Sequence, residues 1–310
     1  MTRVHVYEND SVASVDAPAR RPLRWAAWRA DGSQALLVGN RGEALAFDGV
    51  SFQRLQTDSE HNLRGVAWSP DGAAALLVGN RGAVLRYDGN RFDELAPATT
   101  ENLRRVAWSP DGSCALIAGN NGAVPRYDAA TASLTPLPGD RAHTLRSIAW
   151  RPDGEYALIG AYASRYAGYP RPHALYRCDG RYTQALLATD DEDDVVAIDW
   201  QPRAARPSAL CIVLAYGEDD SVTNKLLTYD GGGFTSVAVE APGALLGGAW
   251  DPGGAYALLC GEGGALFRLS DGRMTAIHTG TRDNLVGPFW RPGHASALLL
   301  KGPDEKVFTV

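Results

Sequence analysis

The stretch NLRGVAWSPDGAAALLVGNRGAVLRYDGNRFDEL, from Asn62 to Leu95, carries the signals that decide the fold of this chain. Its first run, Leu63 to Trp68, is apolar on both faces except at Arg64, which is typical of a strand packed between two neighbouring sheets. Pro70 cannot donate to a sheet ladder, and the Asp-Gly pair that follows it favours a tight reversal. The stretch therefore begins with an inner strand that ends in a turn.

Three more strands are expected in the same stretch. Ala75 to Val78 is predicted to form the second strand, and Gly79 to Gly82 supplies residues that tolerate positive φ at the next hairpin. Val84 to Tyr87 alternates apolar and polar side chains and ends at an Asp-Gly reversal. The outer strand is predicted over Phe92 to Leu95. The whole pattern is a meander of four antiparallel strands.

Tryptophan shows that this pattern is repeated. The intervals between successive repeat tryptophans are 40, 40, 42, 50, 50 and 40 residues. The residues concerned are Trp28, Trp68, Trp108, Trp150, Trp200, Trp250 and Trp290. Four-stranded units of about 40 residues predict an all-β fold, a seven-bladed β-propeller formed by the single domain 1–310. Each tryptophan is expected to lie between adjacent blades.

The two ends of the chain are expected to share the last blade and close the ring. The last unit contains strands at Leu285 to Trp290 and Ala297 to Leu300 but no outer strand, and residues 1–22 resemble an orphaned outer half. Ser11 to Val15 is predicted to complete this blade and remove an exposed edge. Val4 to Tyr7 and Lys306 to Val310 both resemble the third strand, and the sequence does not choose between them.

Composition excludes several classes of function. With 45% apolar residues, 21% charged residues and a net charge of −6, the chain is expected to be a soluble protein that does not bind nucleic acid. No apolar stretch reaches the length of a membrane span, and Met1 to Asp16 lacks the apolar core of a signal peptide, which predicts a cytoplasmic protein. The four cysteines form no CxxC pair, and no cofactor or metal is predicted.

The repeats resemble known propeller families. The WSPDG-type units look like the bacterial WD40-like propeller repeats, and the segment ALLVGNRGAVLRYDG is similar to repeats of photosystem assembly factor and sialidase-like propellers. No unit ends in the Trp-Asp pair of eukaryotic WD40 blades, and none has a complete Asp-box. Such families include scaffolds, lectins and hydrolases, so the resemblance implies a fold and a binding role but no reaction.

Candidate binding residues lie in the loops of one rim, called the top, which holds the loops before the first strand and between the second and third strands. The fourth unit has an insertion there, YASRYAGYPRPH, suited to stacking on sugars or partner side chains and to binding carboxylates. Its candidate residues are Tyr162, Arg165, Tyr166, Tyr169, Arg171 and His173. The alternative is an ordered loop whose tyrosines pack over the rim.

An acidic patch is predicted beside this insertion. It comprises Asp190, Asp191, Glu192, Asp193, Asp194, Glu218, Asp219 and Asp220. These carboxylates are suited to docking a basic partner or coordinating a hard cation, but the ligand spacing of a calcium loop is absent. The alternative is a solvated run of charges.

A repeated arginine is the third candidate. It stands four residues before the tryptophan in four consecutive units, as Arg24, Arg64, Arg104 and Arg146. The later units have Val196, Leu246 and Val286 there, so a cationic arc at the channel mouth would be one-sided. Such an arc is suited to an anionic ligand. Alternatively, the arginines pair with acids such as Glu60, Glu101 or Asp140, or stack on aromatic rings.

These features favour a noncatalytic scaffold that binds a protein partner through its top-rim loops, chiefly those of the fourth and fifth units. No HExxH, GxSxG, P-loop or complete dinucleotide motif is present, although the sequence does not decide whether the chain is an enzyme. The alternatives are a propeller that binds a glycan or small anionic molecule, and a hydrolase or lyase working at the channel mouth.

Overall fold

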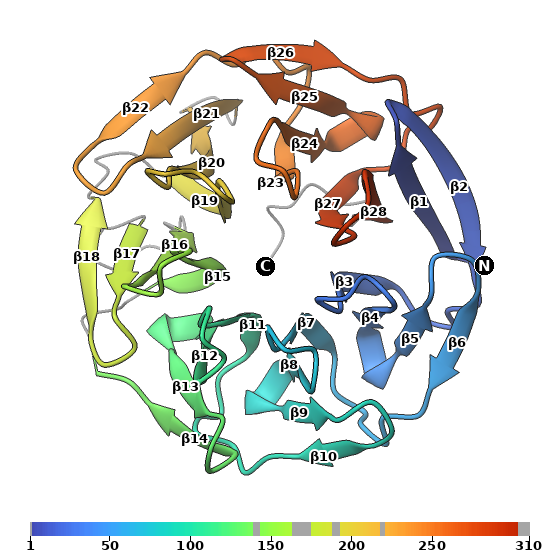
Figure 1. The fold of residues 1–310 in the computed structure, drawn as a ribbon, viewed down its shortest axis with the longest axis vertical. Helices are drawn as coiled ribbons and strands as arrows, with labels where there is room; N and C mark the ends of the chain where they lie inside the picture. The colour runs from blue at the N-terminus through green and yellow to red at the C-terminus, as the bar shows by residue number, and fades with distance from the viewer. Residues whose placement is uncertain (1, 139–142, 163–174, 188–192, 218–220, 303–310) are drawn as a thin grey trace.

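Short antiparallel strands surround a central axis in the computed structural model (Figure 1). The model describes residues 2–138, 143–162, 175–187, 193–217 and 221–302. Within these residues the only helices are four 3-10 turns: η1 (Asn40–Gly42), η2 (Asn80–Gly82), η3 (Asn120–Gly122) and η4 (Glu262–Gly264). The all-β prediction is confirmed.

The strands fall into four sets by their distance from the axis (Figure 1). The innermost are β3 (Leu23–Trp28), β7 (Leu63–Trp68), β11 (Leu103–Trp108), β15 (Thr144–Trp150), β19 (Asp193–Trp200), β23 (Leu245–Trp250) and β27 (Leu285–Trp290). The second strands are β4 (Ala35–Gly39), β8 (Ala75–Gly79), β12 (Cys114–Gly119), β16 (Ala157–Tyr162), β20 (Ala209–Tyr216), β24 (Ala257–Gly261) and β28 (Ser296–Lys301). The third strands are β5 (Ala44–Phe47), β9 (Val84–Tyr87), β13 (Pro125–Asp128), β17 (Leu175–Cys178), β21 (Val222–Tyr229), β25 (Leu266–Ser270) and β1 (Thr2–Glu8). The outer strands are β6 (Phe52–Leu55), β10 (Phe92–Glu94), β14 (Ser133–Pro136), β18 (Thr183–Leu187), β22 (Phe234–Val237), β26 (Arg273–Ala276) and β2 (Ser11–Ala17).

These strands pair as four-stranded antiparallel meanders. We call β3–β6, β7–β10, β11–β14, β15–β18, β19–β22 and β23–β26 units 1 to 6, and we call β27, β28, β1 and β2 the terminal unit. Five of these meanders are separate four-stranded sheets. Units 4 and 5 join into one eight-stranded sheet through a single pairing, Tyr162 with Asp194.

Apolar side chains fill the spaces between neighbouring units. The second strand of unit 2, ALLVG, is buried along its whole length, because sheets cover both of its faces. Leu36 and Val38 of unit 1 pack with Leu63, Val66 and Leu77 of unit 2 in one cluster. The core is therefore a series of layers between sheets.

The repeat tryptophans tie one unit to the next, as the sequence predicts. The indole Nε1–H of Trp108 donates to the Ala67 carbonyl of the preceding unit at 3.2 Å, and that of Trp150 donates to Ala107 at 3.2 Å. Trp290 makes the same bond, to Ala249, at 3.2 Å. These three indoles are thus both packing elements and links between units.

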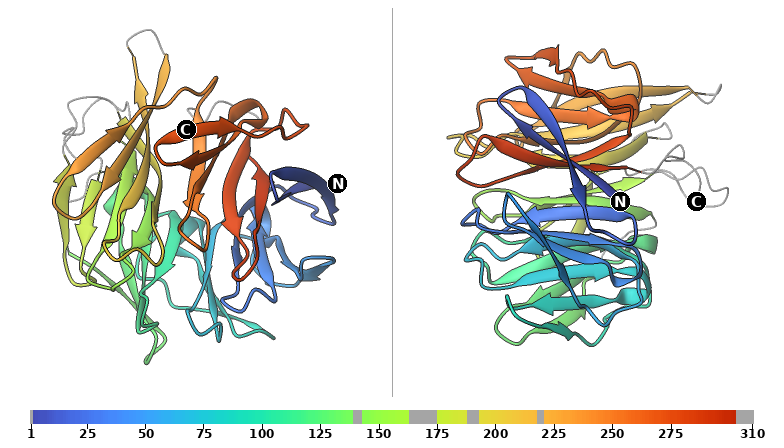
Figure 2. Two further views of the ribbon diagram at one scale, coloured as in Figure 1. Left: turned by 45° about the horizontal axis from the view of Figure 1, so that its top comes forward. Right: turned by 90° about the vertical axis from the view of Figure 1, so that its right-hand side faces the viewer.

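The two ends of the described chain meet in the terminal unit. Strand β1 pairs antiparallel with β28 from Val4 opposite Leu300 to Glu8 opposite Ser296, and β2 covers the outer edge of β1. Figure 2 shows these blue strands beside the red ones. Val4 to Tyr7 therefore takes the third-strand position, and Lys306 to Val310 lies outside the described residues.

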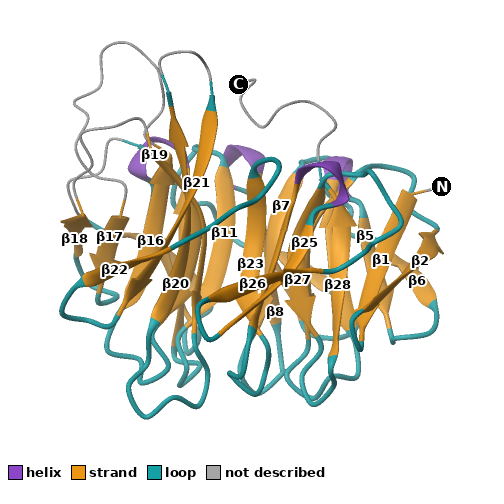
Figure 3. Ribbon diagram, turned by 90° about the horizontal axis from the view of Figure 1, so that it is seen from above, coloured by secondary structure: helices purple, strands orange, loops and turns teal. Residues whose placement is uncertain are grey.

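The two edges of the sheets carry different turns (Figure 3). The top edge holds the 3-10 turns, and the Gly42 N–H of η1 donates to the His61 carbonyl before the next innermost strand at 2.7 Å. The bottom edge holds the turns that follow the repeat tryptophans. No helix among the described residues has the length and apolar character needed to cross a membrane.

Candidate functional site

A β-bulge at the top of the innermost strands sets the position of the repeated arginines. The strand register shifts between Leu63 and Gly65, which makes Arg64 the extra residue, and equivalent shifts occur at Arg24, Arg104 and Arg146. A bulge bends its strand and re-aims the side chain at the extra residue. The same backbone irregularity therefore presents an arginine in each of units 1 to 4.

Neutral side chains hold three of these arginines. Nε of Arg64 donates to Asn80 Oδ1 at 3.0 Å, where Asn80 is the first residue of η2 in the same unit. Arg24 and Arg104 make the same bond to the asparagines that begin η1 and η3, at 3.0 and 2.8 Å. Among the described residues, the Nη atoms of these three guanidiniums donate no hydrogen bond. The asparagines therefore orient these three guanidiniums without neutralising their charge.

The acidic partners considered for the arginines do not pair with them within the described part of the chain. Glu101 accepts a hydrogen bond from Asn121 Nδ2 at 3.0 Å instead, and Glu60 makes no ion pair there. Asp140 lies outside the described residues. The alternative of stacking holds for Arg146, whose guanidinium lies 4.0 Å from the ring centroid of Tyr162.

A fifth arginine, not singled out in the sequence, joins this arc. Arg105 Nη1 donates to the carbonyls of Arg64 and Arg104, each at 2.8 Å. Its guanidinium lies 3.5 Å from the ring centroid of Trp25, two units away. Gly65 stands between, where a Cβ would lie 2.8 Å from the Arg104 carbonyl oxygen. The missing side chain at position 65 thus lets the backbone of Arg104 and Arg105 in unit 3 approach unit 2 closely.

The five guanidiniums form one electrostatic group, which we call the arginine arc: Arg24, Arg64, Arg104, Arg105 and Arg146. Burial first, and then the charges of Arg146 and Arg64, lower the pKa of Arg104 to about 10. Burial is also the main cause that lowers the pKa of Arg105 to about 9, with further contributions from the other three nearby arginines. Both remain protonated at neutral pH, so their like charges repel without compensation.

The remaining units carry uncharged residues at the equivalent positions. Val196 and Leu246 stand at the same bulge in units 5 and 6, and both are partly buried. Val286 takes this position in the terminal unit and packs against the core beside β3. The arginine arc is therefore confined to units 1 to 4.

The acidic patch requires a correction at two of its eight residues. Asp193 and Asp194 are the first residues of β19 and are only 3% and 7% exposed. Asp193 pairs with Lys225 Nζ at 3.1 Å, and Asp194 accepts a hydrogen bond from the Tyr216 hydroxyl at 3.0 Å. They belong to the strand because its ladder extends to both of them, so they are not part of an exposed acidic rim.

Most of the other predicted loop residues lie outside the described part of the chain. These are Asp190, Asp191, Glu192, Glu218, Asp219 and Asp220 of the acidic patch, and Arg165, Tyr166, Tyr169, Arg171 and His173 of the insertion. Tyr162 is described and contacts the arginine arc through the stacking of Arg146 on its ring. In the described ranges no three His, Cys, Asp or Glu side chains gather closely enough to hold a metal ion.

Comparison with solved structures agrees with the fold. The β-propeller domain of Cps50 (Swd1) from Myceliophteria thermophila matches 91% of this chain and 96% of its own, with a TM-score of 0.60 and 14% sequence identity. No family model matches the sequence, and no curated protein is similar to it in sequence. At this identity the likeness establishes a β-propeller fold.

Proposed function

We propose that this chain is a WD40-like propeller of seven four-stranded blades that acts as a noncatalytic scaffold for a partner protein. The pairing of β1 with β28 supports a ring closed by the two ends of the chain. Packing of Val4 and Leu298 in the terminal unit against Leu23 and Leu37 in unit 1 supports the same closure. A closed ring would hold the top edge rigid and present its side chains in fixed positions.

The partner surface is proposed to be the arginine arc, and its ligand an acidic segment of the partner protein. The observation that carries this proposal is that Arg24, Arg64 and Arg104 are held by asparagines rather than by carboxylates. Each guanidinium keeps Nη donors suited to a carboxylate, and charge-assisted bonds of this kind are stronger than neutral ones. Binding an anion would also relieve the repulsion within the arc.

The arrangement favours a chain of acidic residues over a single small anion. The arginines come from four neighbouring units, so their donors are spread along the channel mouth and suit several carboxylates in succession. The net charge of −6 would oppose an extended polyanion such as nucleic acid beyond this mouth. Arg165, Tyr166, Tyr169, Arg171 and His173 are proposed as further partner contacts.

Fluorescence anisotropy with a labelled peptide of alternating glutamate and serine tests the proposal. The matched peptide carries glutamine in place of glutamate. We expect only the acidic peptide to bind. Arg64→Gln or Arg104→Gln should lower the affinity for this peptide about tenfold or more, because each change removes charge-assisted bonds. Arg81→Gln removes the same charge from an exposed position in η2 and should have a much smaller effect.

The outcomes separate the candidate functions. Equal binding by the glutamine peptide, or equal losses in the Arg64 and Arg81 variants, would contradict an acidic-peptide site at the arc. Citrate that binds as tightly as the peptide would instead support the small-anion alternative.

A further inference from the structure

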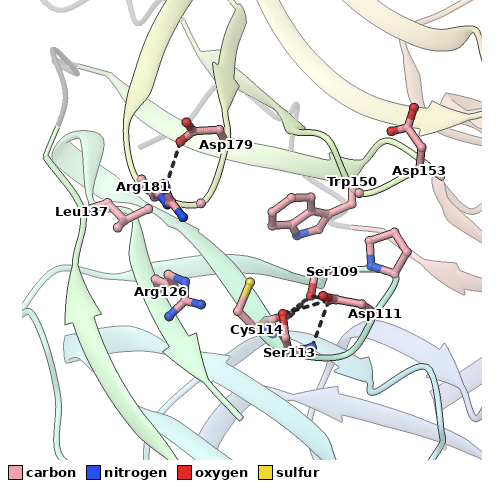
Figure 4. Close-up of a pocket in the computed structure, with 13 residues that line it drawn as sticks. Ser109, Asp111, Ser113, Cys114, Arg126, Leu137, Trp150, Asp153, Asp179 and Arg181 are labelled. Carbon is pink, nitrogen blue, oxygen red and sulfur yellow. Dashed lines mark hydrogen bonds between the residues drawn. The ribbon is translucent and has the colours of Figure 1, made fainter. Parts of the chain in front are cut away.

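A pocket of about 800 Å³ opens at the bottom edge between units 3 and 4, away from the arginine arc. Figure 4 shows the indole of Trp150 between the Ser109–Ser113 turn and the side chains of Asp179 and Arg181. Its lining includes three carboxylates, those of Asp111, Asp153 and Asp179. Because it lies at the opposite edge, what it binds is independent of the proposed function.

Two other junctions between units show what fits at this position. Arg29, the residue after the unit 1 tryptophan, places its guanidinium 5.6 Å from the Trp68 ring centroid and donates from Nε to the Gly72 carbonyl at 2.8 Å. Arg291 of the terminal unit does the same at the junction with unit 1, where its guanidinium lies 4.7 Å from the Trp28 ring centroid and its Nε donates to the Gly32 carbonyl at 2.8 Å. In both, an arginine fills a slot formed by the next unit's tryptophan and turn glycine.

The slot between units 3 and 4 lacks this arginine because the equivalent residue is Ser109. Its short side chain turns back into its own unit, where the hydroxyl donates to Asp111 Oδ1 at 2.6 Å. Across the junction, Trp150 and Gly154 are equivalent to Trp68 and Gly72. Among the described residues, no guanidinium stacks on Trp150 and no donor bonds the Gly154 carbonyl.

The charges around the slot suit a cation. The guanidinium of Arg126 is paired with the Asp128 carboxylate of the same strand, through Nη1 to Oδ2 at 3.1 Å. The other arginine of the pocket lining, Arg181, is exposed. Asp153 stands in the turn that carries Gly154, and its half-exposed carboxylate already pairs through Oδ2 with Arg151 Nη1 at 3.3 Å. A guanidinium entering over Trp150 would therefore meet an aromatic face, a backbone acceptor and a carboxylate.

We propose that this slot is a binding site for an arginine side chain of a partner polypeptide. The incoming guanidinium stacks on Trp150 and donates to the Gly154 carbonyl, as Arg29 and Arg291 do in their own junctions. A lysine fits less well, because its ammonium lacks the planar fork that stacks and donates at once.

The test is an NMR titration of ¹⁵N-labelled protein with the capped peptide Gly-Ser-Arg-Ser-Gly, followed at the indole Nε1–H of Trp150. Two matched peptides carry citrulline, which is neutral with a similar shape, or lysine in place of arginine. We expect a saturable shift of the Trp150 resonance with the arginine peptide, weaker binding of the lysine peptide and no shift with citrulline. Equal shifts with arginine and citrulline would overturn the proposal.

Two serine variants locate the site. Ser109→Arg supplies the missing guanidinium from the chain itself and should weaken peptide binding about tenfold or more by filling the slot. Ser69→Arg adds the same side chain at the junction of units 2 and 3 and should leave the titration unchanged. Peptide binding retained in Ser109→Arg, or lost equally in both variants, would contradict the assignment.

A third variant tests the site even if Ser109→Arg does not fold. Asp153→Asn keeps the turn and should lower the affinity for the arginine peptide severalfold, because it removes the carboxylate charge. If Asp153→Asn binds as tightly as the wild type while Ser109→Arg is unfolded, the slot assignment is wrong.

Discussion

The guanidinium of Arg105, in unit 3, lies 3.5 Å from the ring centroid of Trp25, in unit 1. Two carbonyl oxygens hold it there, and no carboxylate pairs with it among the described residues. A partly buried cation with only neutral partners is costly in a folded protein unless a ligand compensates it. This contact therefore connects the packing of the innermost strands to the binding role proposed for the arginine arc.

The close approach of the Arg104–Arg105 backbone to unit 2 depends on Gly65. A Cβ at that position would lie 2.8 Å from the Arg104 carbonyl oxygen and 3.1 Å from the Arg105 Cα, so backbone must shift to accept it. We expect Gly65→Ala to reduce the free energy of unfolding by about 1–3 kcal/mol and to weaken binding of the acidic peptide. Urea denaturation and peptide anisotropy measure the two effects. Gly89→Ala is not a fair control because Gly89 has positive φ, whereas Gly233→Ala meets open space and should change neither.

Replacing Arg105 by methionine should stabilise the ligand-free protein at low ionic strength. The change keeps an apolar side chain against Trp25 and removes both a partly buried charge and its repulsion with Arg64 and Arg104. The melting temperature of the wild type should rise with added salt, and that of the variant should rise less. Arg54→Met should lower the melting temperature, because Arg54 pairs with the buried carboxylate of Glu43 at 3.2 Å. A lower melting temperature for Arg105→Met would mean that the arc is not strained.

Because of Asp199, the free energy of unfolding should fall as the pH rises towards neutrality. Burial raises the pKa of its carboxyl to about 7, although the Trp250 N–H donates to it at 2.8 Å. The folded protein therefore retains a proton that the unfolded chain releases above about pH 4, so this stabilising contribution is complete below that pH and is lost as pH rises to about 7. Asp199→Asn should gain stability relative to wild type between pH 5 and about 8. Urea titrations across this range give the difference in the free energy of unfolding, and a difference that does not change with pH would mean that the pKa of Asp199 is not raised.

Phenylalanine substitutions should distinguish two classes of repeat tryptophan. Trp108 donates its indole N–H to the Ala67 carbonyl at 3.2 Å, whereas the buried Nε1 of Trp68 has no partner among the described residues. Trp108→Phe should therefore cost about 1 kcal/mol more than Trp68→Phe in the free energy of unfolding. Alanine at either position should cost about 3–5 kcal/mol. Equal costs for the two phenylalanine variants would show that the interunit hydrogen bond contributes nothing.

Much of the fold follows from local signals in the sequence. The interval between tryptophans and the turn residues after them predict β7 at its observed bounds, Leu63–Trp68. The spacing of Tyr7 and Trp28 predicts the outer strand at Ser11 to Val15, and the structure extends it to Ser11–Ala17. These features depend on contacts within a unit or on the repeat itself, and both can be read from one chain.

The parts that the sequence did not predict depend on register and on contacts between units. The bulge at Arg104 shifts the strand alternation, so Arg105 could not be assigned to the channel mouth from its position alone. Asp193 and Asp194 look like the end of an acidic loop, and only their pairing with β20 places them in a strand. The role of Ser109 becomes visible only when the junctions between units are compared.

The most direct test of the arginine arc is the side-chain Nε–Hε spectrum of the ¹⁵N-labelled protein during titration with the acidic peptide. We predict saturable shifts for Arg64, Arg104 and Arg105 with one common dissociation constant, and unchanged positions for Arg29 at the bottom edge. Shifts confined to arginines outside the arc, or no shift at Arg64 and Arg104 while the peptide binds, would contradict the account.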